Sequence, residues 1–74
     1  MYKLVEKLVG EFGEVLQTIK LGTSNELKEL VNKAIVIDTE FQDCGYLTTT
    51  GQEVFTVKHE FYCNDELIFE TEVM

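Results

Sequence analysis

The most restrictive feature of this chain is the alternation of side chains in residues 54–73, on both sides of Asn64-Asp65. Before this pair, one face of the alternation holds Phe55, Val57, His59, Phe61 and Cys63. After it, one face holds Leu67, Phe69, Thr71 and Val73. A period of two residues is typical of a strand with one buried face, so this segment predicts a β-hairpin.

The length of the hairpin loop decides which side chains face each other. With Asn64-Asp65 alone as the loop, Phe61 would lie opposite Ile68, and the apolar face of one strand would meet the acidic face of the next. A loop with an odd number of residues, most simply Asn64-Asp65-Glu66 with a bulge, brings the apolar faces together. We therefore predict this loop and the pairs Phe61–Phe69, Val57–Val73, Tyr62–Ile68, Lys58–Glu72 and Glu60–Glu70.

The pair Glu60–Glu70 is an unfavourable consequence of that register. Directly opposed like charges in a sheet are mildly destabilising. Burial of each aromatic side chain on the opposite face contributes about 1.5–3 kcal/mol, which is larger. The apolar pairing therefore decides the register, and the two glutamates need no function to explain their position.

The segment 35–42 shows the same period of two. Its two faces would hold Ile35, Ile37, Thr39 and Phe41 on one side, and Val36, Asp38, Glu40 and Gln42 on the other. This pattern predicts a half-buried strand. Asp43-Cys44-Gly45 is a turn signal, and residues 46–52 form either a short edge strand or an extended loop.

The N-terminal segment has apolar side chains at helical spacing. They are Val5, Leu8, Phe12, Val15 and Ile19. This spacing predicts an amphipathic helix over residues 2–20 that stops at Gly22. The alternative interpretation breaks the helix at Gly10–Gly13 and makes Glu14–Leu21 a strand.

A second helix is predicted to follow, from Thr23 to about Ala34. Thr23-Ser24-Asn25-Glu26 matches a capping box. The complete prediction is one small α+β domain, residues 1–74, with two N-terminal helices on one face of a three- to four-stranded antiparallel sheet, an ααβββ meander. The other face of this sheet is expected to be open to solvent.

The open sheet face is the predicted binding surface. It would mix acidic and apolar side chains, which is common on surfaces that bind proteins. The candidate partner-binding residues on it are Asp38, Glu40, Glu60, Tyr62, Ile68, Glu70 and Glu72.

The charge of the chain is unevenly placed. The formal net charge is −8, and residues 35–74 account for all of it, because acids and lysines balance in residues 1–34. The chain has six lysines and no arginine. Arginine is the usual residue for bidentate phosphate and guanine recognition, and duplex DNA requires several cations. The composition therefore argues against direct nucleic-acid binding and for a basic protein partner.

Few residues are suited to catalysis or metal binding. His59 falls on the inward face of its strand, where we expect a hydrogen-bonded core residue. Cys63 lies about 13 Å further along that face, too far to share a metal ion with His59. Cys44 has no close cysteine with which to complete a zinc site. We expect reduced thiols, no metal, no cofactor and no enzymatic activity.

The sequence also suggests a compartment. The longest aliphatic run, Ala34–Ile37, is far too short to span a bilayer, and charges at Lys3, Glu6 and Lys7 interrupt any leader-like segment. We expect a cytoplasmic protein without membrane contact.

Two hypotheses for the function follow. The first is a non-enzymatic inhibitor whose acidic face docks on a basic surface of a partner protein, such as a nucleic-acid-handling enzyme. In a more specific version of this hypothesis, the acidic face imitates the charge of a nucleic acid, as small acidic inhibitors from phages and mobile elements do. The alternative is a small structural protein that forms a homodimer or larger assembly through the open face, or through an edge at residues 46–50 or 67–73.

Overall fold

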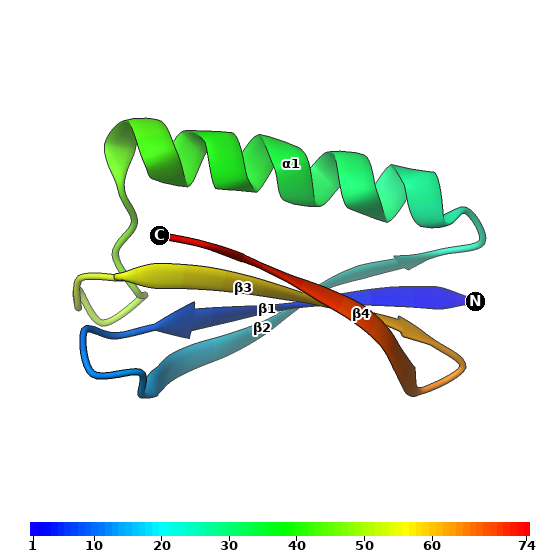
Figure 1. Cartoon of the computed structure of the whole chain (residues 1–74), viewed down its shortest axis with the longest axis horizontal. Coiled ribbons are helices and arrows are strands. Elements are labelled where there is room, and N and C mark those ends of the chain that lie inside the picture. The colour runs from blue at the N-terminus through cyan, green and yellow to red at the C-terminus, as the bar shows by residue number, and fades with distance from the viewer.

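The fold is α+β, with one helix lying across one face of a four-stranded antiparallel sheet (Figure 1). The computed structural model describes all 74 residues. The elements are β1 (Tyr2–Val9), β2 (Val15–Ser24), α1 (Leu27–Cys44), β3 (Thr56–Cys63) and β4 (Glu66–Val73). The strands are ordered β2-β1-β3-β4. The predicted ααβββ order is therefore wrong, because the chain runs ββαββ.

The predicted helix over residues 2–20 is a β-hairpin formed by β1 and β2. The alternative that placed a strand after Gly10–Gly13 was the better interpretation, and Gly13 takes the positive φ of +83° in the turn. The alternation in β1 was obscured because its inward positions are Leu4, Glu6 and Leu8. A buried glutamate in the middle of the strand breaks the pattern of apolar residues at every second position.

The predicted strand at residues 35–42 is the second half of α1. A helical stripe of Leu30, Ala34 and Phe41 is buried against the sheet, and this packing overrides the alternation of the segment. The helix ends where Gly45, at φ +71°, donates its N–H to Phe41 O at 2.8 Å.

The start of α1 also differs from the predicted capping box. The first helical residue is Leu27, and Glu26 at the N-cap makes no side-chain cap bond. Ser24 takes the organising role instead. Its Oγ accepts the Glu26 N–H at 3.0 Å, and its hydroxyl donates to Glu29 at 2.8 Å.

The β3–β4 hairpin has the predicted register but a different loop. Asn64 and Asp65 form a two-residue turn with φ of 50° and 67°, the signature of a type I′ turn. A bulge in β4 at Ile68 supplies the one extra residue that this register requires. The predicted pairs that are confirmed are Phe61–Phe69, Val57–Val73, Lys58–Glu72 and Glu60–Glu70. Tyr62 faces Leu67 instead of Ile68.

The core between α1 and the sheet consists of two apolar clusters. One contains Leu4, Leu30, Ala34 and Phe61. The other contains Leu8, Phe41, Val54 and Val57. Residues 46–55 form a loop held by an isolated bridge between Leu47 and Glu53, so the extended-loop alternative describes them. No helix in the chain combines the length and the apolar character needed to cross a bilayer.

Candidate functional site

A buried polar cluster separates the two apolar clusters. The side chain of His59 in β3 is completely buried, and its Nε2 lies 2.9 Å from Oε2 of Glu6 in β1. Its Nδ1 lies 3.1 Å from Oδ1 of Asp38 in α1. The second contact is close but does not have the alignment of a hydrogen bond. His59 therefore contacts the helix through Asp38 and the neighbouring strand β1 through Glu6.

This cluster is suited to holding the helix in place and not to catalysis. Burial is the largest influence on Asp38 and raises the pKa of its carboxyl, although the nearby His59 opposes that shift. Each ring nitrogen of His59 faces a carboxylate oxygen, so the carboxyls of Glu6 and Asp38 hold the ring from two sides. The fully buried ring cannot touch a substrate, in agreement with the prediction of a hydrogen-bonded core histidine.

The open face of the sheet is mixed in charge and is not uniformly acidic. One row across it runs Lys20, Val5, Glu60 and Glu70 over the four strands. Neighbouring rows contribute Lys3, Lys7 and Lys58. The sequence could not show this, because the segment that carries the first three lysines was predicted to be helical.

Glu60 is neutralised on this face. Although the face is open, Glu60 is only 8% exposed. Its carboxylate accepts hydrogen bonds from Lys7 Nζ at 3.1 Å and from the Tyr62 hydroxyl at 2.9 Å. Burial favours a higher pKa for Glu60, but the bonds from Lys7 and Tyr62 outweigh it and hold the pKa below its usual value. Glu60 is therefore a paired structural carboxylate.

The seven predicted binding residues do not form one surface. Glu60, Tyr62, Glu70 and Glu72 lie together on the outer face of β3 and β4, and Ile68 lies at the β4 bulge. Asp38 and Glu40 are on α1, across the sheet from the open face. Asp38 contacts His59, and Glu40 accepts a hydrogen bond from the Tyr46 hydroxyl at 3.3 Å.

Several acidic side chains gather at β4, the last strand of the sheet (Figure 1), where Asp65 and Glu72 have only exposed contacts to lysines and Glu66 and Glu70 have none. We call this surface the acidic β4 edge. It consists of Asp65, Glu66, Glu70 and Glu72, with the partly exposed apolar residues Leu67, Ile68 and Phe69. These apolar side chains are 47%, 43% and 39% exposed. α1 packs mainly over the other three strands, which leaves the inner side of β4 partly uncovered, and Leu67 faces outward opposite Tyr62. The strand contains neither lysine nor proline, the residues that commonly block an edge.

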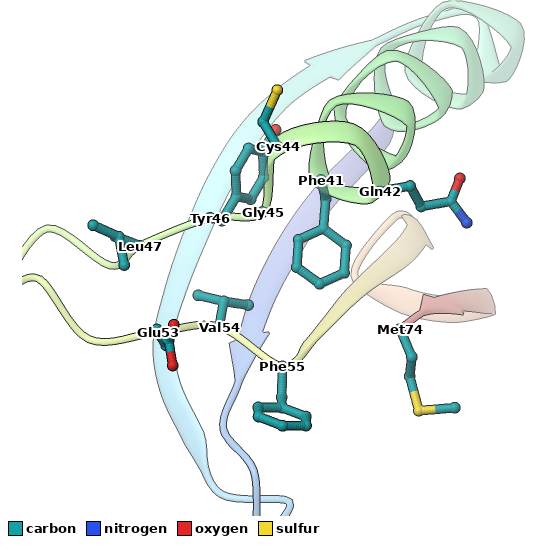
Figure 2. A pocket seen from close by; sticks show the side chains of 10 residues that line it. All are labelled: Phe41, Gln42, Cys44, Gly45, Tyr46, Leu47, Glu53, Val54, Phe55 and Met74. Carbon is teal, nitrogen blue, oxygen red and sulfur yellow. The ribbon is translucent and has the colours of Figure 1, made fainter.

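A second feature is a shallow groove of about 680 Å³ beside the end of α1. Figure 2 shows Phe41 pointing into it from the helix, with Val54 and Phe55 from the loop and Met74 on the far side. Glu53 is the only charged residue in its lining. The Cys44 sulfur points away from the centre of the groove (Figure 2), and no histidine lies there to activate it. Seven of its ten lining residues are hydrophobic, so the groove offers a largely apolar contact surface.

The remaining reactive side chains are dispersed. Cys44 is exposed and Cys63 is half-buried, and both are free thiols. No three or more His, Cys, Asp and Glu side chains converge in a way that could hold a metal ion.

Comparison with known proteins does not assign a family. The chain matches no protein-family model, no curated protein and no solved structure. The function is therefore argued from the geometry and charge of its own residues.

Proposed function

We propose that this domain is a non-enzymatic protein-binding module that uses the acidic β4 edge to bind a basic surface of another protein. The observation that carries the proposal is the combination, on one edge strand and the turn before it, of four acids and three partly exposed apolar residues without any basic residue. Apolar contacts supply affinity on such a surface, and the charge selects and steers the partner.

The pairing of charges supports this location. Lys7 bonds to Glu60, which leaves Glu70 opposite it without an ion-pair partner. Glu72 has only a long contact to Lys58, at 3.9 Å, and both side chains are substantially exposed. Exposed pairs of this kind are weak, so they do not neutralise the edge effectively.

The shape of the charged region bears on the class of partner. A nucleic-acid backbone presents closely spaced charges of one sign. The lysines on the open face interrupt its acidic residues, so the negative surface is a strip along β4 and not a whole face. A basic strip or strand of a partner fits this shape, and nucleic-acid-handling enzymes are one class of protein that carries such surfaces.

Self-association through the same edge is disfavoured. In a symmetric dimer the same patch from both copies meets itself. Two β4 strands would therefore bring Glu70 and Glu72 of one copy against the same glutamates of the other. Like charges opposed in this way are destabilising, which favours a different, basic protein as the occupant.

Affinity capture from a cell lysate, followed by purification of the captured protein, tests the proposal. The dissociation constant is then measured for the unsubstituted domain and for Glu70→Lys/Glu72→Lys, at low and high ionic strength. The control is Glu11→Lys/Asp43→Lys, which changes the charge equally at exposed acids without ion pairs. We expect the β4 variant alone to lose roughly tenfold or more in affinity. Equal binding by both variants, or capture of an acidic protein, would contradict the proposal.

A further inference from the structure

We infer that the partner binds by adding a β-strand to the free edge of β4, and that this strand alternates basic and apolar residues. The inference rests on the proposed function and specifies how the acidic β4 edge is used. Two features carry it, namely the direction of the β4 backbone groups and the difference between the two edges of the sheet.

The backbone of β4 presents unused hydrogen-bonding groups at Glu70 and Glu72. Asn64 donates its N–H to Met1 O at 3.2 Å, so Asn64 faces β1. Backbone N–H and C=O groups alternate in direction along an antiparallel strand. The backbone groups of even-numbered residues in β3 therefore point to β1, like those of Asn64, and the backbone groups of odd-numbered residues point to β4. The backbone groups of their partners in β4, Phe69 and Thr71, point to β3. Those of Glu70 and Glu72 therefore point to the free edge. None of the backbone hydrogen bonds outside the helix and strands involves these two residues.

The other edge of the sheet, at β2, is protected. Lys33 Nζ donates to Leu21 O at 2.8 Å, so the helix occupies one backbone carbonyl of β2. The side chain of Gln17 accepts the Thr49 N–H at 3.1 Å, so the loop covers part of this edge. The β1–β2 ladder has two register shifts and the β3–β4 ladder has one, so the irregularities that blunt an edge are more frequent at β2. β4 is therefore the edge on which an added strand would pair.

The side chains of β4 define the chemistry of the added strand. Glu70 and Glu72 project from the outer face, so residues beside them on that face are expected to be lysine or arginine. Phe69 lies on the inner face, still 39% exposed, so residues there are expected to be aliphatic. Such a strand buries the apolar side of β4 and neutralises its acidic side in one register.

An octapeptide of alternating lysine and valine is a direct probe. The matched control has the same composition in two blocks, with the lysines first and the valines second. Amide hydrogen exchange at Glu70 and Glu72 is measured with each peptide. Strand addition predicts that the alternating peptide slows exchange at both amides more than the block peptide does. Binding of the alternating peptide without slower exchange would overturn the inference, as would slower exchange caused by raising the domain concentration alone.

Two substitutions at Glu70 distinguish the contribution of its backbone N–H to binding from the contribution of its carboxylate. Glu70→Gln removes the carboxylate and keeps the outward N–H, whereas Glu70→Pro removes both. Proline is tolerated in an edge strand where the N–H faces solvent. We expect Glu70→Pro to bind the alternating peptide about two- to tenfold more weakly than Glu70→Gln, the effect of one lost hydrogen bond.

The outcomes distinguish this inference from the proposed function. Equal weakening by both variants would overturn strand addition and leave the acidic edge as the binding surface. No weakening by either variant would overturn both. Thermal unfolding checks that each variant is folded. If Glu70→Pro unfolds, the exchange measurement on the unsubstituted domain decides the question.

Discussion

Glu60 lies directly opposite Glu70 across β3 and β4, and Lys7 Nζ, 3.1 Å from Glu60 Oε2, neutralises only the first of them. The apolar pairing on the inner face, with Phe61 stacked on Phe69 at 4.4 Å between ring centroids, enforces this register. The structure therefore tolerates one like-charge pair by bonding one carboxylate and leaving the other exposed. This division makes Glu70 available to a partner.

Replacement of Lys7 should change how stability depends on acid pH. The pKa of Glu60 is below its ordinary value of 4.5 in the folded protein, so the stability it provides is present above that value. The stability is lost as the pH falls through the lowered pKa. Lys7→Met should therefore destabilise the domain at neutral pH and show a smaller further loss in acid.

Urea unfolding at a series of pH values measures this effect. Lys20→Met is the matched control, because Lys20 is exposed and forms no ion pair on the same face. Parallel curves for Lys7→Met and the unsubstituted domain, at every pH from neutral to acid, would contradict the assigned role of Lys7.

The buried cluster predicts a contrast between single and combined substitutions. His59→Leu removes the ring nitrogens that face Glu6 and Asp38 and leaves the buried carboxyl of Glu6 without a hydrogen-bond partner, which should cost about 3–5 kcal/mol. The triple change Glu6→Leu/His59→Leu/Asp38→Leu removes every charge and should recover most of that loss. Chemical denaturation measures both. A His59→Leu variant as stable as the unsubstituted domain would show that the cluster does not hold the helix.

Tyr46 should titrate at unusually high pH. Burial, followed in size by the nearby Glu40, raises the pKa of its hydroxyl to about 12. The unfolded chain ionises this group near 10, so the stability it provides is complete below that pH and is lost as the pH rises towards about 12. Ultraviolet absorption should show a late tyrosinate transition that disappears in Tyr46→Phe. An unchanged titration curve for that variant would refute the assignment.

The turn of the β3–β4 hairpin offers a stabilising change. Asp65 has φ +67°, a region in which glycine is the least strained residue. Asp65→Gly should therefore stabilise the domain by about 0.5–1 kcal/mol, and the exposed 3.4 Å contact to Lys3 is a small loss. Thermal unfolding should show no gain for Asp65→Ala, which loses the same carboxylate but keeps a Cβ. Equal gains for both would mean that charge, not backbone strain, is responsible.

The sequence predicted the C-terminal hairpin because its alternation extends over both faces and both strands. The N-terminal half misled the interpretation for a physical reason. Glu6 occupies an inward position that only its contact with His59 makes acceptable, and this contact exists only in the folded chain. Phe12 was counted in an apolar helical stripe, yet it is 88% exposed in a turn.

The candidate site was predictable in part. The excess of acid near the C-terminus identified the outer side of β3 and β4, including Glu70 and Glu72. The pairing of Glu60 with Lys7 depends on β1 lying beside β3, and no local sequence pattern predicts this long-range contact. The position of Asp38 on a helix was missed because Ile35-Val36-Ile37 has strand-forming preferences that packing overrides.

The most direct test of the account is to map the binding of the alternating lysine–valine octapeptide residue by residue, by nuclear magnetic resonance on isotope-labelled domain. We expect the chemical-shift changes to follow residues 66–73 and the facing residues of β3. We also expect them to be greatly reduced in Glu70→Lys/Glu72→Lys and retained in Glu11→Lys/Asp43→Lys. Shift changes centred on the groove around Phe41 and Phe55, with β4 undisturbed, would contradict the claim that the acidic β4 edge is the binding surface.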